Sequence, residues 1–351
     1  MKPLQTHLAQ EIDDALKTGR PFAFAMFPGE TDVMRFGSGQ ASDGCSFDVS
    51  PWLGLFGNRI RIDGFDSAVH THIPKMQIPD SSTPRDIYLR SVDTVSRRCM
   101  ERNGKTVLSR AICGTLPQRA SIGSIACRFF ASYPQTFRHI YFTPSTGCWI
   151  GATPEVLLDF DKTSGRFATM AFAGTRRRGT ATSWDKKNIG ENRFVIDYIA
   201  EQLQAEGIEV ETSPLTSVAF GDIEHLCCHI TGQTTPGKLA EMIDAINPTP
   251  ALCGYPKEDA IRDIKAVERH ARNCYGGFVA IDDGGRYRAF VNLRCMQIID
   301  NRFCIYAGGG IVADSNALAE LQETEAKSSR LQYLLGLHTD ARSDNLKQEN
   351  G

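Results

Sequence analysis

The feature that most constrains the fold is a dense series of short apolar segments that begins at Lys105 and ends at Gly310. The segments are TVLSRAI, HIYFT, CWIGA, EVLLDF, RFATMAFAG, YGGFVAI, RYRAFVNLRCMQI and RFCIYAGGG, and each is apolar throughout or alternates with a period of two. Both patterns are typical of β-strands. Neighbours such as FVAIDDGGRYRAFV, with its Asp-Asp-Gly-Gly turn, predict β-hairpins. Because hairpins pair strands antiparallel, we expect an α+β fold with antiparallel sheets rather than a series of βαβ units.

Two long helical patterns, Trp184–Gln204 and Ser315–Leu335, accompany these strands. Residues 1–100 offer little beyond two strand-like stretches, PFAFAMF and RIRIDGF, and are expected to contribute to the sheet scaffold. No Pro/Ser-rich linker, internal repeat or low-complexity tract divides the chain, so residues 101–337 are predicted to form the catalytic region of the same single domain. The polar tail, residues 338–351, is predicted to be disordered.

Composition narrows the possible partners and the cellular compartment. The net charge of the 351-residue chain is only −2, which gives no support to electrostatic binding of nucleic acid or of a membrane surface. Its 11 cysteines are scattered without a zinc-binding spacing, and the N-terminus lacks the apolar core of a signal peptide. No apolar run reaches the roughly 18 residues that cross a bilayer. We therefore expect a soluble cytoplasmic protein with reduced thiols.

The helical pattern at Ser315–Leu335 places charge on its apolar face. Glu320, Glu323 and Lys327 lie on the same stripe as Leu331 and Leu334 at 3.6 residues per turn. Burying a carboxylate costs several kcal/mol unless a cation or hydrogen bonds compensate, so this row suggests a site. The alternative is a solvated face on which Glu323 and Lys327 form an ordinary i,i+4 pair.

The helical pattern at Trp184–Gln204 repeats this feature, because Glu191 lies on the same face as Val195 and Tyr198. Two helices that each present an inward glutamate can form an oxygen cage for Mg²⁺, which usually takes one or two carboxylates together with water and an anionic substrate. A metal site of this kind is assembled from distant segments, since no EF-hand run occurs. A binding protein whose inward acids form only structural ion pairs remains the generic alternative.

Three shorter motifs do not support a nucleotide or zinc site. The Gly104-Lys105-Thr106 run lacks the first glycine and the preceding strand of a P-loop, and SVDTVSRRCMERN before it is typical of a helix. The glycines 308–310 are not surrounded by the βαβ unit of a dinucleotide site, although their amides can approach an anion closely. His225 and His229 fall in HLCCHI, which is typical of a strand, so we interpret them as core or edge histidines.

Taken together, a series of segments resembles the chorismate-utilising enzymes, which include isochorismate, salicylate, anthranilate and aminodeoxychorismate synthases. In order they are GKTVLSR, ATPEVLL, AGTRRRG, DKKNIGEN, NPTPALCGYP, the YGG turn at Tyr275, VNLRC and AGGGIVADSNALAELQETEAK, spread over residues 100–335. Each segment alone is weak, but their common order makes a chance agreement very improbable. The resemblance implies a single α+β domain with two large antiparallel sheets stacked face to face and flanked by helices.

The resemblance also implies a metal and a substrate. It implies Mg²⁺ with Glu191 and Glu323 as direct ligands, and with Glu320 acting nearby or through water. Chorismate is a dianion, so its ring carboxylate would bind the metal and Arg294 would hold the enolpyruvyl carboxylate with a bidentate fork. The other residues expected at the substrate are Gly174, Thr175, Tyr275, Gly308, Gly309, Gly310 and Lys327.

Within the family, the nucleophile delivered to ring carbon 2 distinguishes the branches. Lys105 stands where the water-using members have a lysine general base, and that role requires a lowered pKa. Glu155 matches the general acid that protonates the departing 4-hydroxyl group, which requires a raised pKa. The resemblance therefore implies an isomerase that converts chorismate to isochorismate. Ala173 argues against aminodeoxychorismate synthases, which carry a nucleophilic lysine at that position, and NPTPALCGYP is more similar to isochorismate synthases than to salicylate synthases.

Three asparagines depart from the family pattern. The family usually has His at the positions of Asn247 and Asn192, and often an acid at Asn188. These replacements leave two alternatives open: a salicylate synthase, which would go on to eliminate pyruvate, and a catalytically silent family member that only binds chorismate. The sequence does not settle the oligomeric state, and we expect a monomer.

Overall fold

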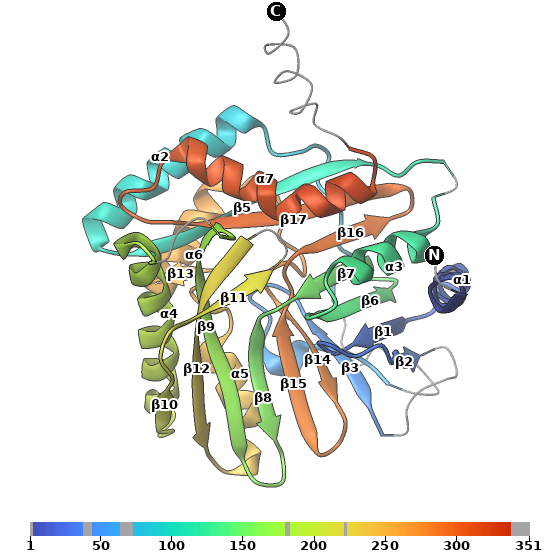
Figure 1. The fold of residues 1–351 in the computed structure, drawn as a ribbon, viewed down its shortest axis with the longest axis horizontal. Coiled ribbons are helices and arrows are strands. Elements are labelled where there is room, and N and C mark those ends of the chain that lie inside the picture. Colours follow the sequence, from blue (N-terminus) through green and yellow to red (C-terminus); the bar gives the residue numbers. More distant parts are fainter. Residues whose placement is uncertain are drawn as a thin grey trace, which may run out of the picture.

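The computed structural model describes residues 3–37, 44–63, 73–118, 120–179, 183–220 and 223–337. The strands of these residues form two large sheets, which lie face to face with helices on their outer sides (Figure 1). The predicted α+β fold with two stacked antiparallel sheets is confirmed. The tail from residue 338, predicted to be disordered, lies outside the described residues.

The first sheet has eight strands in the described residues, and every neighbouring pair is antiparallel. Their spatial order is β13 (Gly254–Tyr255), β5 (Lys105–Thr115), β17 (Arg302–Ile311), β16 (Cys295–Ile299), β7 (Gly147–Thr153), β6 (Phe137–Thr143), β1 (Phe22–Met26) and β2 (Met34–Gly37). The first hundred residues thus supply the β1–β2 edge of this sheet, in which β1 falls within the strand-like stretch PFAFAMF.

The second sheet has nine strands in the described residues, again with antiparallel pairing. The order is β10 (Val210–Thr212), β12 (Ile223–Gln233), β9 (Arg166–Arg177), β8 (Val156–Asp161), β15 (Arg286–Val291), β14 (Phe278–Asp282), β3 (Ser46–Ser50) and β4 (Ile60–Ile62), and β11 (Thr216–Phe220) also pairs with β12. The hairpin predicted from FVAIDDGGRYRAFV is the β14–β15 pair.

The main core lies between the two sheets. It contains large aromatic side chains from both, and Phe137 of β6 stacks on Phe290 of β15 with ring centroids 4.0 Å apart. Trp149 and Tyr306 of the first sheet are also fully buried there and stack with centroids 5.6 Å apart. Each such side chain removes 150–250 Å² of surface from water, so these contacts hold the sheets together.

The helices cover the outer faces. Around the first sheet lie α1 (Pro3–Lys17), α2 (Arg85–Arg102), α3 (Ile122–Ser132) and α7 (Ala317–Leu334), with α7 running across β17 (Figure 1). Beside the second sheet, α4 (Lys186–Ala205) packs on β9 and β12, and α5 (Leu239–Ile246) packs on α4. The remaining helices are α6 (Lys257–Val267), which packs against β5 and β13, and the short 3₁₀ turns η1 (Phe56–Asn58) and η2 (Pro236–Lys238).

One strand prediction is wrong. The stretch RYRAFVNLRCMQI was expected to be a single strand, but it forms β15 in the second sheet and β16 in the first. The break falls between them, where Arg294 adopts the left-handed conformation with φ of 49°. The chain crosses between the sheets again from β7 to β8, at Pro154 and Glu155. The two crossings are neighbours, because the amide of Val291 donates to the carbonyl of Glu155 at 3.1 Å.

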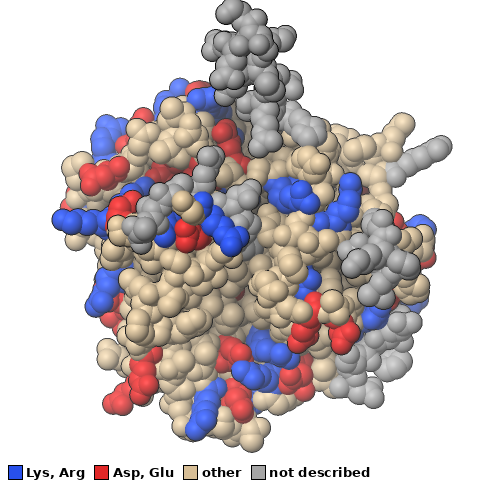
Figure 2. Space-filling view, in the orientation of Figure 1, with Lys and Arg blue, Asp and Glu red and all other residues tan. Residues whose placement is uncertain are grey.

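On the face shown in Figure 2, Lys and Arg side chains are interspersed with Asp and Glu side chains, and no large patch carries charge of one sign. None of the helices in the described part of the chain is both long enough and apolar enough to cross a membrane.

Candidate active site

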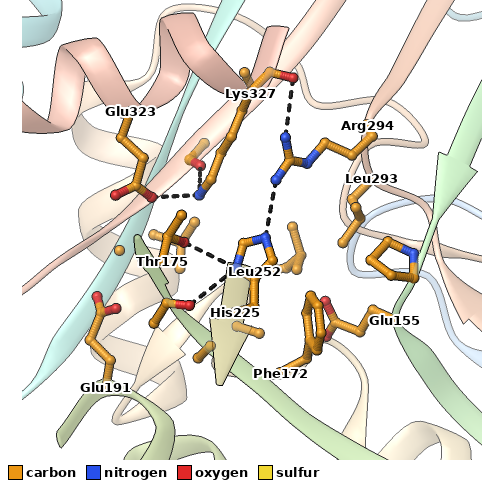
Figure 3. A pocket seen from close by; sticks show the side chains of 18 of the residues that line it. Glu155, Phe172, Thr175, Glu191, His225, Leu252, Leu293, Arg294, Glu323 and Lys327 are labelled. Carbon is orange, nitrogen blue, oxygen red and sulfur yellow. Dashed lines mark hydrogen bonds and ion pairs between the residues drawn. The ribbon is translucent and has the colours of Figure 1, made fainter. Parts of the chain in front are cut away.

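A cavity lies between the strand crossings, the N-terminal part of α4 and the middle of α7 (Figure 3). It collects residues from segments that are far apart in the sequence. Of the residues predicted for the site, the cavity is lined by Lys105, Glu155, Gly174, Thr175, Glu191, Tyr275, Arg294, Gly308, Gly310, Glu323 and Lys327. The fold therefore brings these predicted residues, which come from distant segments of the sequence, into one cavity.

Gly309 and Glu320 do not line this cavity. Side chains alternate between the two faces of a strand, so Gly309 of β17 faces the opposite side from Gly308 and Gly310. A Cβ at Gly309 would lie 3.1 Å from Glu320 Oε2, on the side of α7. Glu320 is 2 % exposed and its carboxylate accepts hydrogen bonds from Lys187 Nζ at 2.7 Å and Ser315 Oγ at 2.8 Å.

Glu323 and Lys327 form an ion pair on the cavity side of α7. Lys327 Nζ donates to Glu323 Oε1 at 2.6 Å and to the carbonyl of Gly308 at 2.9 Å. Burial by itself would raise the pKa of Glu323, but Lys327, together with Lys187 and Arg294, holds this pKa below its ordinary value. Glu323 is therefore a carboxylate at neutral pH, and the charged stripe predicted for this helix faces the interior.

Glu191 enters the cavity from α4, opposite Glu323 (Figure 3). Its side chain is buried, and burial raises its pKa, with a further increase from Glu323 and a partial offset from Lys105. No partner donates a hydrogen bond to this carboxylate within the described ranges. A cation bound between Glu191 and Glu323 would relieve both the burial and the repulsion.

The carboxylates do not form a closed metal cage. Among the described residues, no group of three or more His, Cys, Asp or Glu side chains is arranged to hold a metal ion. Glu191 and Glu323 thus offer two hard oxygen donors on an open cavity, and the remaining ligands of a bound metal would have to be water or substrate.

Gly310 leaves the space in which Glu191 and Lys105 approach one another. A Cβ at this position would overlap Glu191 Oε1 and would lie 2.7 Å from Lys105 Cε. Both atoms belong to the ends of flexible side chains, so we expect Gly310→Ala to fold normally while displacing two site residues. A misplacement of this size should reduce turnover by on the order of 10²-fold. Gly57→Ala, whose added methyl group meets no atom within 4 Å and lies outside the cavity lining, is the matched control. Equal activities of the two variants, measured at equal thermal stability, would contradict this expectation.

Glu155 is a protonated acid at neutral pH. It sits at the β7–β8 crossing and is only 1 % exposed. Burial raises its pKa from 4.5 to about 8, although Lys105, a long hydrogen bond from Thr249 Oγ1 at 3.5 Å and Lys327 each oppose the rise. A carboxylic acid that keeps its proton up to about pH 8 can donate that proton to a leaving group.

Lys105, at the start of β5, is 2 % exposed and reaches the same cavity. In the part of the chain that the structure describes, its ammonium makes no hydrogen bond to a protein group. Its positive charge opposes the rise in the pKa of both Glu155 and Glu191. A buried amine without protein acceptors is available to a bound substrate or water molecule.

His225 belongs to the site, contrary to its interpretation as a core or edge histidine. Its Nδ1 lies 3.1 Å from both the carbonyl of Gly174 and Thr175 Oγ1, and Arg294 Nη2 lies 3.2 Å from its Nε2 (Figure 3). Burial, together with Arg294 and Lys327, holds the pKa of His225 well below 6.5, so the ring is neutral. Because a guanidinium can only donate, Nε2 accepts and Nδ1 carries the proton. His225 therefore orients Arg294, and the strand alternation of β12 was the sequence signal that could have placed it inward.

A comparison with known families identifies this arrangement. The profile of the family described as chorismate binding enzyme matches residues 63–336, which is most of the chain. The chain belongs to this family.

Relatives of this chorismate-binding enzyme include the isochorismate synthase EntC of Escherichia coli, which is 28% identical over 280 residues, covering 76% of this chain and 70% of EntC. Anthranilate synthase component 1 of Arthrobacter globiformis is 30% identical over 217 residues, covering 57% of this chain and 40% of that protein. The structure of MenF, the menaquinone-specific isochorismate synthase from Escherichia coli, superposes with a TM-score of 0.73 at 17% identity, covering 90% of this chain and 88% of MenF. The fold is thus shared with solved structures.

The three asparagines that depart from the family pattern have structural partners in this chorismate-binding enzyme. Asn188 Oδ1 accepts from the amide of Thr175 at 2.9 Å, which fixes the cavity wall. Asn192 donates from Nδ2 to three backbone carbonyls, those of Ala171, Ala173 and Leu226, and so ties α4 to β9 and β12. Asn247 is not part of the cavity lining, and its Nδ2 donates to the carbonyl of Gly54 at 3.3 Å. None of the three asparagines is part of the cavity lining.

Proposed function

We propose that this chorismate-binding enzyme is an isochorismate synthase, an isomerase that adds water to ring carbon 2 of chorismate while the 4-hydroxyl group leaves. The observation that carries the proposal is the presence of a protonated buried acid, Glu155, and a buried amine without protein acceptors, Lys105, in one cavity. The relatives named isochorismate synthase support the same reaction.

The acid and the amine divide the proton transfers. Lys105, once it has given up its proton, takes a proton from the attacking water as oxygen bonds to carbon 2. Both ring double bonds shift by one position, from C1=C2 to C1=C6 and from C5=C6 to C4=C5, and the bond from carbon 4 to its hydroxyl group breaks. Glu155 donates its proton to this hydroxyl, which leaves as water. Because one water enters and one leaves, substrate and product have the same composition.

The cavity contains cations for a dianionic substrate. Arg294 is fixed by its hydrogen bonds to His225 and to the carbonyl of Lys327 at 3.3 Å, which directs its guanidinium into the cavity beside Leu293. A fixed, planar guanidinium recognises a carboxylate with little loss of side-chain freedom. We assign Arg294 to the enolpyruvyl carboxylate, with Tyr275, Gly174 and Thr175 forming the wall.

The residues present fit Mg²⁺. Glu191 and Glu323 would hold it, and it would supply positive charge to fix the ring carboxylate of chorismate. Glu191 needs a counter-charge because its burial is not compensated by a hydrogen bond. Glu320, whose carboxylate accepts hydrogen bonds from Lys187 and Ser315, would act on the metal site through water or through the position of α7.

We expect Glu191→Gln and Glu323→Gln each to lower turnover by on the order of 10²-fold or more, because each removes one negative donor from the metal site. Mg²⁺ binding measured by calorimetry should weaken in parallel. Glu325→Gln, on the exposed part of α7, is the matched control and should behave as the wild type. Wild-type activity of both variants in the presence of excess chelator would refute the metal assignment.

Chromatography of the products from purified protein, chorismate and Mg²⁺ tests the proposed reaction. Isochorismate is the expected product, and the reverse reaction from isochorismate should also proceed. Salicylate with stoichiometric pyruvate would identify a salicylate synthase instead, and anthranilate formed from added ammonia would identify an anthranilate synthase. No turnover of bound chorismate would point to a silent family member. The cytoplasmic location and the monomeric state stay predictions.

A further inference from the structure

A pair of cysteines on neighbouring strands lies outside the active site. Cys113 of β5 and Cys304 of β17 are direct register partners, and their sulfur atoms are 3.3 Å apart. All 11 cysteines are free thiols, and among the described residues no other two cysteine sulfurs make a hydrogen-bond contact. This separation is shorter than that of two sulfur atoms in ordinary packing, so Cys113 and Cys304 are in direct contact.

The backbone around Cys113 shows that this is a non-hydrogen-bonded pair. The amide of Cys113 donates to Ser82 Oγ at 2.9 Å, and its carbonyl accepts from the same hydroxyl at 3.2 Å. The amide of Ala111 likewise donates to Thr83 Oγ1 at 3.0 Å, and its carbonyl accepts from the backbone amide of Thr83 at 2.8 Å. In an antiparallel strand the amide and carbonyl of one residue point the same way, so those of Cys113 point away from β17.

A non-hydrogen-bonded antiparallel pair brings its side chains closest. Its Cα atoms are about 4.5 Å apart, which falls within the range of 4.4–6.8 Å that a disulfide spans. Cys113 and Cys304 can therefore be joined by rotating their side chains, without moving either strand. No third metal-ligating side chain accompanies them in the described ranges, so the pair is not a metal site.

Of the two cysteines, only Cys113 is partly exposed to solvent. Cys304 is fully buried at the edge of the core between the sheets, whereas Cys113 is half-buried, and only Cys45 shares that exposure among the cysteines. The hydrogen-bond contact with Cys304 outweighs burial and lowers the pKa of Cys113, and Arg302 lowers it further. The accessible thiol is thus the more acidic one, and its resolving partner is in contact with it.

We propose that Cys113 and Cys304 form a modification site at which a hydroperoxide produces a reversible disulfide between β5 and β17. The thiolate of Cys113 attacks hydrogen peroxide, the O–O bond breaks, and Cys113 becomes a sulfenic acid with release of one water. The Cys304 sulfur then attacks the Cys113 sulfur, the S–O bond breaks, and a second water leaves. Two thiols and one peroxide thus give one disulfide and two waters, and a dithiol reductant restores the thiols.

The disulfide would join two strands that also carry active-site residues, since β5 begins at Lys105 and β17 contains Gly308 and Gly310. It closes a sequence separation of 191 residues, which restricts the unfolded chain strongly. The expected consequence is a more stable protein under oxidising conditions. This inference does not rest on the proposed reaction.

The test treats the full-length protein with a small excess of hydrogen peroxide and maps its peptides without reduction. The expected results are a linked Cys113–Cys304 peptide pair and a Tm that rises by roughly 5 °C or more, both reversed by dithiothreitol. Cys113→Ser and Cys304→Ala should each abolish the rise, and Cys45→Ser, the matched half-buried control, should keep it. Recovery of Cys113 as sulfinic or sulfonic acid, as an unmodified thiol, or linked to another cysteine would overturn the proposal.

Discussion

Glu155→Gln is expected to reduce kcat by on the order of 10² to 10⁴ with little change in substrate affinity. The amide keeps the shape of the buried acid but cannot donate the proton that the leaving 4-hydroxyl group requires. The wild-type rate should fall as pH rises through about 8, where Glu155 loses its proton, and this limb should be missing from the residual activity of the variant. A change confined to KM would show that Glu155 positions the substrate.

The same variant separates catalysis from stability. The folded protein holds the Glu155 proton up to about pH 8, while an unfolded chain releases it near the ordinary value of 4.5. The folded state therefore binds more protons, and the stability of the wild type falls as pH rises through this window. Glutamine stays neutral, so Glu155→Gln should be more stable than the wild type at pH 8, by about 1 kcal/mol or more. Denaturation at pH 5 and pH 8 measures the difference, and a variant that is less stable at both values would contradict the burial argument.

Lys105→Ala is expected to lose water addition, again by on the order of 10² to 10⁴ in kcat, while it still binds chorismate. Lys105→Arg should be as inactive, because a guanidinium keeps the charge but does not give up a proton. A small amine such as methylamine should restore part of the activity of Lys105→Ala. If Lys105→Arg instead retained the wild-type rate, the lysine would contribute only its charge.

Most of the fold could be predicted from local sequence patterns. The strand series and the β14–β15 hairpin could be predicted because period-two alternation and a Gly-rich turn are local signals. The break at Arg294 could not, because Asn292, Leu293 and Arg294 continue the alternation of polar and apolar residues without a proline or glycine. The chain passes from the second sheet to the first at this position because of the way the two sheets pack, and no local pattern indicates that passage.

The helical stripes predicted that these acidic side chains lie on the inward face of each helix, but they did not distinguish the roles of the individual acids. Glu320 and Glu323 lie on one stripe of α7, yet one turns toward Lys187 and the other toward the cavity, a difference set by the position of α4. The outward direction of Gly309 was available from strand alternation alone. The contribution of His225 depends on Arg294, which lies 69 residues away in the sequence, and no local motif contains that contact.

Incubation of the protein with chorismate and Mg²⁺ in ¹⁸O-labelled water tests the central claim most directly, because it follows the oxygen that Lys105 is assigned to activate. The account predicts isochorismate with the label at ring carbon 2 and no release of pyruvate. Unlabelled isochorismate, or salicylate formed with an equal amount of pyruvate, would contradict it.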